Sequence, residues 1–253
     1  MLKPEDVVFH LGRQEKHWKA GRSAHALSAL WYRQNALPQS VKSALVTRVE
    51  FESAKLIDAF LERVVDLRTP GRPSQTDLLA VISLVDKLAI MAVEAKAGEP
   101  FGSHVSEWND GGSGKRLRLS ALCRTLNIAE ELAGPLRYQL LHRAASAIYE
   151  AQRYKTDVAI MLIESFAPDD KSFVDFAAFL HAIGEHGEVS RSRMFGPFDC
   201  EGVAFYAGWI DEDPESVDRD QSRCLQELRR YADQLSLYCD RLRAWCDGRA
   251  SKP

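Results

Sequence analysis

The sequence has few cysteines, and none of them form a pair at metal-binding or redox spacing. There are five in 253 residues, an odd number, and no Cys-x-x-Cys motif occurs. A disulfide framework needs paired cysteines, and a zinc finger needs closely spaced ones. Neither is indicated, and we expect buried thiols at the five positions, which are Cys123, Cys200, Cys224, Cys239 and Cys246.

Long apolar runs are also missing. No stretch reaches the roughly 18 uninterrupted apolar residues that a transmembrane helix requires. The opening residues, 1–16, lack the apolar core and the small-residue cleavage site of a secretory signal. We therefore expect no membrane partner and a cytoplasmic location.

The chain has no excess of basic residues. Its 33 Lys and Arg are outnumbered by 36 Asp and Glu, for a formal net charge of −3. Domains that bulk charge holds to nucleic acid are usually basic overall or on one face, so any nucleic-acid contact here has to be local.

Glycine and proline are sparse, and 45% of the residues are hydrophobic, which is typical of a folded globular chain. We expect one domain over residues 1–253.

Helical periodicity marks both ends of the chain. Residues 17–38 carry apolar side chains at helical spacing, and a second helical stretch runs from Pro38 to about residue 60. From Pro214 to about residue 247, apolar residues alternate three and four apart. This long C-terminal helix either packs across its own domain or joins two copies in a homodimer, and both alternatives stay open.

Short apolar runs between the helical parts predict a sheet. Three runs divided by turn residues predict antiparallel strands at 62–69, 75–84 and 88–97. Further on, the pattern predicts helices at 115–127 and 135–154, and strands at 156–166 and 202–210. The order predicts an α/β fold with a mixed central sheet flanked by helices. Its parts are an N-terminal helical part (1–50), a core (51–213) and the C-terminal helix (214–247).

The second and third predicted strands bring polar residues together. If their hairpin turns between Val85 and Asp86, Asp77 lies opposite Glu94. Every second side chain of a strand shares a face, so Lys96 projects beside Glu94 and opposite Gln75. We therefore expect four polar groups at one end of an apolar hairpin.

Charges inside a buried sheet need compensation, and two explanations compete. Two adjacent carboxylates suit a hard cation such as Mg²⁺ or Mn²⁺, and a neighbouring ammonium can steer an attacking water and offset charge on a phosphorane-like transition state. Alternatively, Asp77 caps a turn while Glu94 and Lys96 form an exposed ion pair at a strand end.

Asp77 followed by Glu94-Ala95-Lys96 resembles the D…ExK signature of the PD-(D/E)xK, or restriction-endonuclease-like, phosphodiesterase superfamily. The resemblance spans about residues 51–166 and implies a restriction-endonuclease-like sheet. It also implies that Asp77, Glu94 and the carbonyl of Ala95 hold Mg²⁺ or Mn²⁺ while Lys96 positions the water. The function so implied is a divalent-metal-dependent nuclease, for which we expect DNA rather than RNA as the substrate.

Other residues carry weaker signals. Gln75 shares the face of the trio, and Gln139 with His142 lies on the next helix, where the fold could bring them near the metal. A branch of the superfamily carries Gln and Tyr four apart on that helix, whereas here Gln139 is followed by Arg143. Glu62 is a candidate for an additional acid. Basic residues that could contact phosphates are Lys115, Arg116, Arg118, Arg137, Arg143 and Arg153.

A second function of another class fits the same residues. The acidic net charge and the modest number of candidate basic contacts favour a catalytically silent nuclease-like scaffold. Such a scaffold would bind nucleic acid or a partner protein, with the carboxylates kept as a structural cluster. Metal binding and cleavage separate the two hypotheses.

Overall fold

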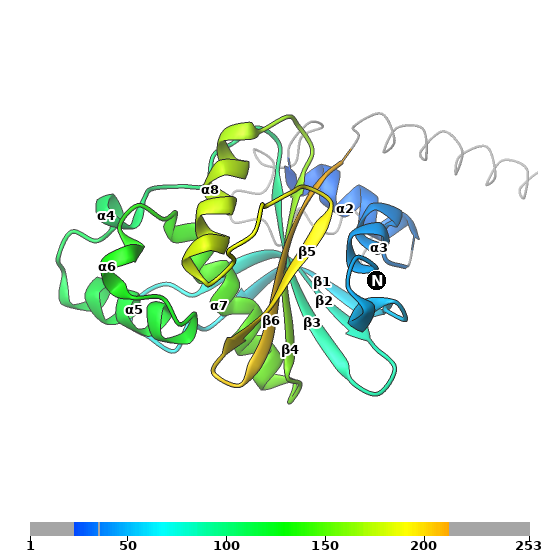
Figure 1. The fold of residues 1–253 in the computed structure, drawn as a ribbon, viewed down its shortest axis with the longest axis horizontal. Coiled ribbons are helices and arrows are strands. Elements are labelled where there is room, and N and C mark those ends of the chain that lie inside the picture. The colour runs from blue at the N-terminus through cyan, green and yellow to red at the C-terminus, as the bar shows by residue number, and fades with distance from the viewer. Residues whose placement is uncertain (1–22, 35, 213–253) are drawn as a thin grey trace, which may run out of the picture. The chain divides into compact units, whose positions relative to one another are not determined.

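The structure is a computed structural model, and it describes residues 23–34 and 36–212 (Figure 1). Its helices are α2 (Ser23–Gln34), α3 (Gln39–Leu45), the 3-10 helix η2 (Val49–Phe51), α4 (Val105–Trp108), α5 (Ser113–Thr125), α6 (Glu130–Ala133), α7 (Tyr138–Arg153) and α8 (Asp170–Ala182). Its strands are β1 (Lys55–Val65), β2 (Ser74–Ser83), β3 (Leu88–Lys96), β4 (Val158–Ser165), β5 (Arg193–Cys200) and β6 (Val203–Asp211). The predicted C-terminal helix at 214–247, with its dimer seam, lies outside the described residues.

One six-stranded sheet organises the described part of the chain, in the order β1-β2-β3-β4-β6-β5. The first three strands are antiparallel, β4 runs parallel to β3, β6 runs parallel to β4, and β5 is antiparallel to β6. The predicted mixed α/β sheet is confirmed. Its centre is apolar on both faces because helices cover both of them.

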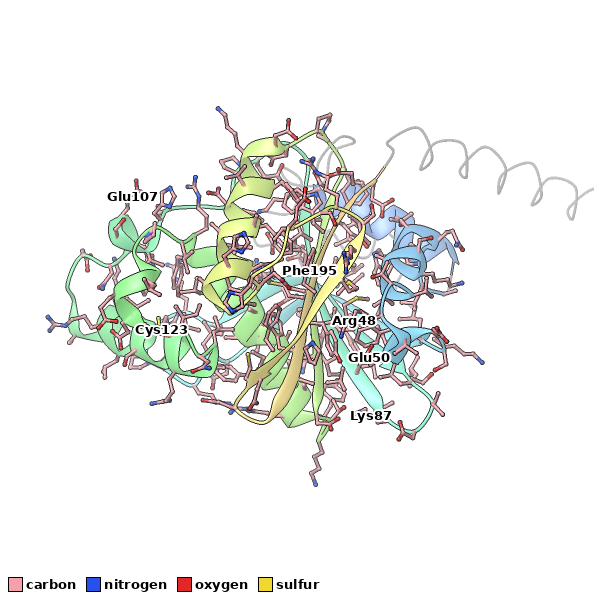
Figure 2. The ribbon with its side chains drawn as sticks, in the orientation of Figure 1. Arg48, Glu50, Lys87, Glu107, Cys123 and Phe195 are labelled. Carbon is pink, nitrogen blue, oxygen red and sulfur yellow. The ribbon has the colours of Figure 1, made fainter. Side chains whose placement is uncertain are left out.

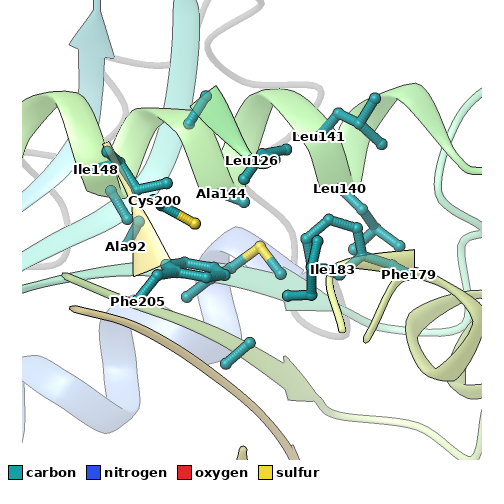
Figure 3. Packing of buried hydrophobic residues seen from close by; sticks show 14 of the residues in the cluster. Ala92, Leu126, Leu140, Leu141, Ala144, Ile148, Phe179, Ile183, Cys200 and Phe205 are labelled. Carbon is teal, nitrogen blue, oxygen red and sulfur yellow. The ribbon is translucent and has the colours of Figure 1, made fainter. Parts of the chain in front are cut away.

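Figure 1 shows α5, α7 and α8 on one side of the sheet and α2 and α3 on the other. On the first side, Ala92 of β3 belongs to the same buried cluster as Ala144 and Ile148 of α7 (Figure 3). On the second side, Trp31 of α2 and Val41 of α3 are almost fully buried. Alternation along β3 therefore directs every second side chain, including Glu94 and Lys96, toward α7.

Two of the five cysteines lie in the described residues, and both are buried free thiols, as predicted. Cys123 lies on α5, on the opposite side of the sheet from Arg48 and Glu50 (Figure 2). Burial raises the pKa of Cys123 to about 11 and that of Cys200 to about 12, and nearby carboxylates contribute to both shifts. These thiols stay protonated, which makes them poor nucleophiles and poor metal ligands.

The predicted helix from Pro38 to about residue 60 is wrong in its second half. The helix α3 ends at Leu45, η2 follows, and Lys55–Val65 form β1, which replaces the predicted strand at 62–69. The cause is that β1 is an edge strand with little fully buried surface, so its apolar residues do not alternate cleanly. Leu56 and Phe60, four apart, imitate a helical repeat.

Besides the short helices α4 and α6, the helix α8 and the strand β5 were not predicted. The helix α8 begins at a cap in which the Asp169 side chain accepts a hydrogen bond from the Ser172 N–H at 2.9 Å. The strand β5 contains Gly196 and Pro197, which weaken a strand pattern in the sequence. None of the helices in the part of the chain described combines the length and the apolar character needed to cross a bilayer.

Candidate active site

The β2–β3 hairpin places Asp77 and Glu94 together. The two strands pair Leu78 with Val93 and continue in that register to Ser83 and Leu88, as the turn at Val85 and Asp86 predicted. Asp77 is the next residue outward on β2, and its Oδ2 accepts a hydrogen bond from the N–H of Ala95 at 2.9 Å. Asp77 thereby closes the end of the hairpin, with its side chain 22% exposed.

Glu94 is surrounded by donors. Its Oε1 accepts from Lys96 Nζ at 3.0 Å and from the Gln139 amide at 2.5 Å, and its Oε2 accepts from Arg143 Nε. Gln139 Oε1 in turn accepts from Lys96 Nζ at 3.1 Å. The Lys96 ammonium also lies 4.8 Å from the ring centroid of Phe101. Gln139 and Arg143 sit one turn apart near the start of α7, so both face the hairpin.

Arg143 lies between the two carboxylates. Beyond its contact with Glu94, its Nη2 lies 4.0 Å from Asp77 Oδ1, and its Nη1 donates to Ser74 Oγ at 2.8 Å. A guanidinium has donors on three nitrogens in a fixed plane, so one side chain can serve several acceptors. Arg143 thus joins the end of β3 to the start of β2.

The predicted trio is assembled, and the alternative of an exposed ion pair is wrong. The side chains of Glu94 and Lys96 are each only 4% exposed. A buried ion pair is costly to desolvate unless further hydrogen bonds satisfy both partners. Gln139 and Arg143 supply those bonds to Glu94.

The two carboxyl groups have opposite pKa shifts. Burial raises the pKa of Asp77 to about 8, and the nearby charge of Glu94 adds to the rise while Arg143 opposes it. Burial would also raise the pKa of Glu94, but Arg143 and Lys96 outweigh burial and lower it. At neutral pH, Asp77 is therefore mainly protonated, and Glu94 is ionised between two cations.

Gln75 does not join Lys96, contrary to the prediction. Its amide donates to Glu62 Oε2 at 2.7 Å, at the outer edge of the site. Glu62 has a positive φ of 53° in β1. Burial raises its pKa to about 7, against the attraction of Arg143. Glu62 is thus electrostatically coupled to the cluster, which is consistent with its selection from the sequence.

His142 contacts the cluster through Ser74. Its Nδ1 lies 3.0 Å from Ser74 Oγ. Burial and the neighbouring Arg143 lower the pKa of His142 to about 3, so the ring is neutral. Because Arg143 can only donate, Ser74 Oγ accepts from it, and the hydroxyl hydrogen is available for His142 Nδ1.

A divalent metal bound here would have to displace the donors that now surround Glu94. Both oxygens of Glu94 already accept hydrogen bonds from cationic side chains, Oε1 from Lys96 and Oε2 from Arg143. Within residues 23–34 and 36–212, no three His, Cys, Asp or Glu side chains come together as a metal site. Ala95 contributes its N–H to Asp77, and the role of its carbonyl as a ligand stays a prediction.

Sequence reasoning noted Arg143 as the residue standing where a tyrosine was expected and as one of several candidate phosphate contacts, but not as a partner of Glu94, and it did not mention Ser74. A signal for Arg143 was present, because residues four apart on a helix share a face and Gln139 was already a candidate. Ser74 carried no such signal, since a serine beside Pro73 is typical of any turn.

Comparison with family models matches residues 1–214 to a domain of unknown function, DUF6946. The comparison with curated proteins gave no match, and neither did the comparison with solved structures. The match to the family model covers most of the 253 residues. The chain therefore belongs to the DUF6946 family.

Proposed function

We propose that this protein is a restriction-endonuclease-like scaffold that binds nucleic acid without a metal, its carboxylate cluster being compensated by Arg143. Support for the fold comes from the order of elements: three antiparallel strands, then α7, then β4 parallel to β3. This is the core order of the superfamily that the D…ExK residues resemble.

One observation carries the metal-free part of the proposal. Arg143 contacts Glu94 directly and lies 4.0 Å from Asp77, between the two carboxylates. A buried carboxylate pair must be neutralised by something. A guanidinium at that position, with Lys96 beside it, removes the need for a divalent cation.

A second candidate, a Mg²⁺- or Mn²⁺-dependent phosphodiesterase, is favoured by a different observation. Asp77, Glu94 and Lys96 project from neighbouring strands to one place, and Arg143 Nη2 is too far from Asp77 Oδ1 for a hydrogen bond. Movement of that one side chain would free an oxygen on each carboxylate. The second candidate therefore depends on Arg143 leaving its present position.

A single set of assays separates the two candidates. Purified protein is incubated with single- and double-stranded DNA and RNA, including modified DNA, in Mg²⁺, in Mn²⁺ and in EDTA, and both binding and nicking are measured. The proposal expects binding in EDTA and no nicking with either metal. Nicking by the wild-type protein that Lys96→Ala abolishes would establish the second candidate instead. Absence of both binding and nicking would overturn both.

A further inference from the structure

A cavity of about 500 Å³ opens beside the carboxylate cluster. Its walls come from the β1–β2 connection, from Trp108 of α4, from the first turns of α5 and from the start of α7. This volume lies within the range of roughly 300–1,000 Å³ that small-molecule sites occupy. Ser74 and His142 line the cavity and also contact each other at 3.0 Å, so the cavity and the cluster share a hydrogen-bonded boundary.

Arg118 is a buried cation in the cavity wall, with only 7% of the residue exposed. It donates to Thr69 Oγ1 at 3.1 Å, to the Arg72 carbonyl at 2.7 Å, to Tyr138 Oη at 3.3 Å and to the Thr69 carbonyl at 3.5 Å. All four acceptors are neutral, and Arg118 takes part in none of the ion pairs among the described residues. A buried charge without a counterion is costly, which suits the binding of an anion.

The loop backbone approaches Arg118 closely because residue 71 is glycine. Gly71 has a φ of +110°, and a Cβ added there would lie 3.1 Å from Arg118 Nη2. This close approach keeps the guanidinium oriented by the loop. Arg118 is therefore held in place before any ligand arrives, which lowers the entropic cost of binding.

Two further cationic side chains line the cavity, and none of its lining residues is a carboxylate. Arg72 is exposed on the loop, and Lys115 is 40% exposed and paired with Asp110 at 2.8 Å. The Lys115–Asp110 pair is at the surface, where such pairs contribute little and exchange partners readily. The electrostatic character of the cavity is therefore positive.

The rest of the cavity is aromatic and apolar. Trp108 and Tyr138 stack with their ring centroids 3.8 Å apart and an interplanar angle of 9°, and Tyr138 lies 4.9 Å from the His142 ring. Pro70 and Pro73 add rigid apolar surface. Flat, rigid side chains of this kind favour a planar ring system in the ligand.

We infer that this cavity binds a nucleoside monophosphate unit, with the phosphate on Arg118 and the base against the Trp108–Tyr138 wall. The inference rests on the proposed function for the choice of nucleic-acid chemistry and names the ligand class that the scaffold takes. The unit can come from a free nucleotide or from the 5′-phosphorylated end of a strand. The two sources present the same phosphate and base.

The test is calorimetric titration of the full chain in EDTA, so that no metal contributes. The titrants are the four common ribonucleoside 5′-monophosphates, inorganic phosphate, and a short oligonucleotide with and without a 5′-phosphate. We expect the nucleotides or the phosphorylated strand to bind at least tenfold more tightly than inorganic phosphate. A stronger signal from the phosphorylated strand than from free nucleotides would identify a strand end as the ligand, and the reverse would identify the free nucleotide.

Three variants make the result specific. Arg118→Gln should abolish binding, with circular dichroism as the check on folding, and the exposed-site variants Arg72→Ala and Lys115→Ala should each weaken it about threefold to tenfold. Lys87→Ala, at the β2–β3 turn, is the matched control and should bind like the wild type. No binding by the wild type, or equal binding by Arg118→Gln and Lys115→Ala, would overturn the inference. Because metal is absent throughout, such a failure is distinct from a finding of metal-dependent nicking.

Discussion

Arg143 and Glu94 form a buried ion pair at the junction of α7 and β3, in which the guanidinium Nε donates to Glu94 Oε2. The same guanidinium lies 4.0 Å from Asp77. This side chain therefore lies between the two carboxyl groups that the sequence resemblance predicted as metal ligands.

Arg143→Ala should destabilise the protein strongly. Removing one partner of a buried pair leaves an uncompensated charge, at a cost of about 3–5 kcal/mol. Urea unfolding measures the change. The matched control is Arg153→Ala on the same helix, whose side chain is 63% exposed and should change stability by less than about 0.5 kcal/mol. Equal effects from both variants would contradict the assigned role of Arg143.

Ser74→Ala should lower the free energy of unfolding by about 1–3 kcal/mol, because Arg143 Nη1 and His142 Nδ1 both lose Ser74 Oγ as their hydrogen-bond partner. The control is Ser83→Ala at the other end of β2, where the hydroxyl makes one long bond of 3.5 Å to the Lys55 carbonyl. Urea unfolding of the two variants should give clearly different midpoints. A neutral Ser74→Ala would show that the link between α7 and β2 does not matter for stability.

Glu62 should titrate near neutral pH. Burial raises its pKa to about 7, and Arg143 opposes the rise. Carbon-detected NMR of the Glu62 carboxyl group should show this midpoint, and the pKa should rise further in Arg143→Ala. A midpoint near the ordinary value of about 4.3 would contradict the burial of this group.

The same shift makes stability depend on pH, with a definite sign. An unfolded Glu loses its proton near pH 4.3, whereas folded Glu62 keeps it up to about pH 7. The unfolded state therefore binds fewer protons between about pH 4 and 7, and the contribution of Glu62 to the free energy of unfolding falls as the pH rises through this window. Glu62→Gln should make the decline shallower, which urea unfolding at several pH values will measure.

Glu164 is a second buried carboxyl group with a raised pKa, and it lies on the opposite face of the sheet from the carboxylate cluster. Burial raises its pKa well above the ordinary value, Glu212 adds to the rise, and the Trp31 Nε1–H, 3.1 Å from each oxygen, opposes it. As with Glu62, a carboxyl group whose pKa is raised in the folded state contributes less to the free energy of unfolding as the pH rises above its pKa in the unfolded state. Glu164→Gln should therefore stabilise the protein at pH 7, and by less at pH 4.

Thermal unfolding at the two pH values tests this difference. The exposed Glu188→Gln serves as the control and should leave the unfolding temperature unchanged at both. A loss of stability in Glu164→Gln at pH 7 would mean that the ionised form of Glu164 is the one that the fold needs.

The core of the fold could be predicted because its signals are local and strong. Apolar runs bounded by turn residues mark β2, β3 and β4, and the hairpin register followed from the turn at Val85 and Asp86. That register alone predicted Asp77 beside Glu94. The first half of the edge strand β1 was mistaken for helix because the strand has little fully buried surface, which leaves an irregular apolar pattern.

The donors that neutralise Glu94 could not be predicted in the same way. Which donor reaches Glu94 depends on where α7 crosses the sheet, and no periodicity in the sequence encodes that crossing. Gln139 was selected and does contact Glu94, whereas Arg143, four residues later, makes the decisive contact. Gln75 was predicted to lie opposite Lys96, but its amide donates to Glu62 instead. The cause is the same, because the partner of a side chain depends on the packing around it in the folded chain.

Calorimetric titration of the wild-type protein with Mn²⁺ tests the central claim most directly. If Arg143 compensates the carboxylates, no binding heat should appear, and the wild type, Asp77→Asn and Glu94→Gln should give the same trace. Binding of one Mn²⁺ per chain by the wild type, lost in both variants, would show that a metal displaces Arg143 from the cluster.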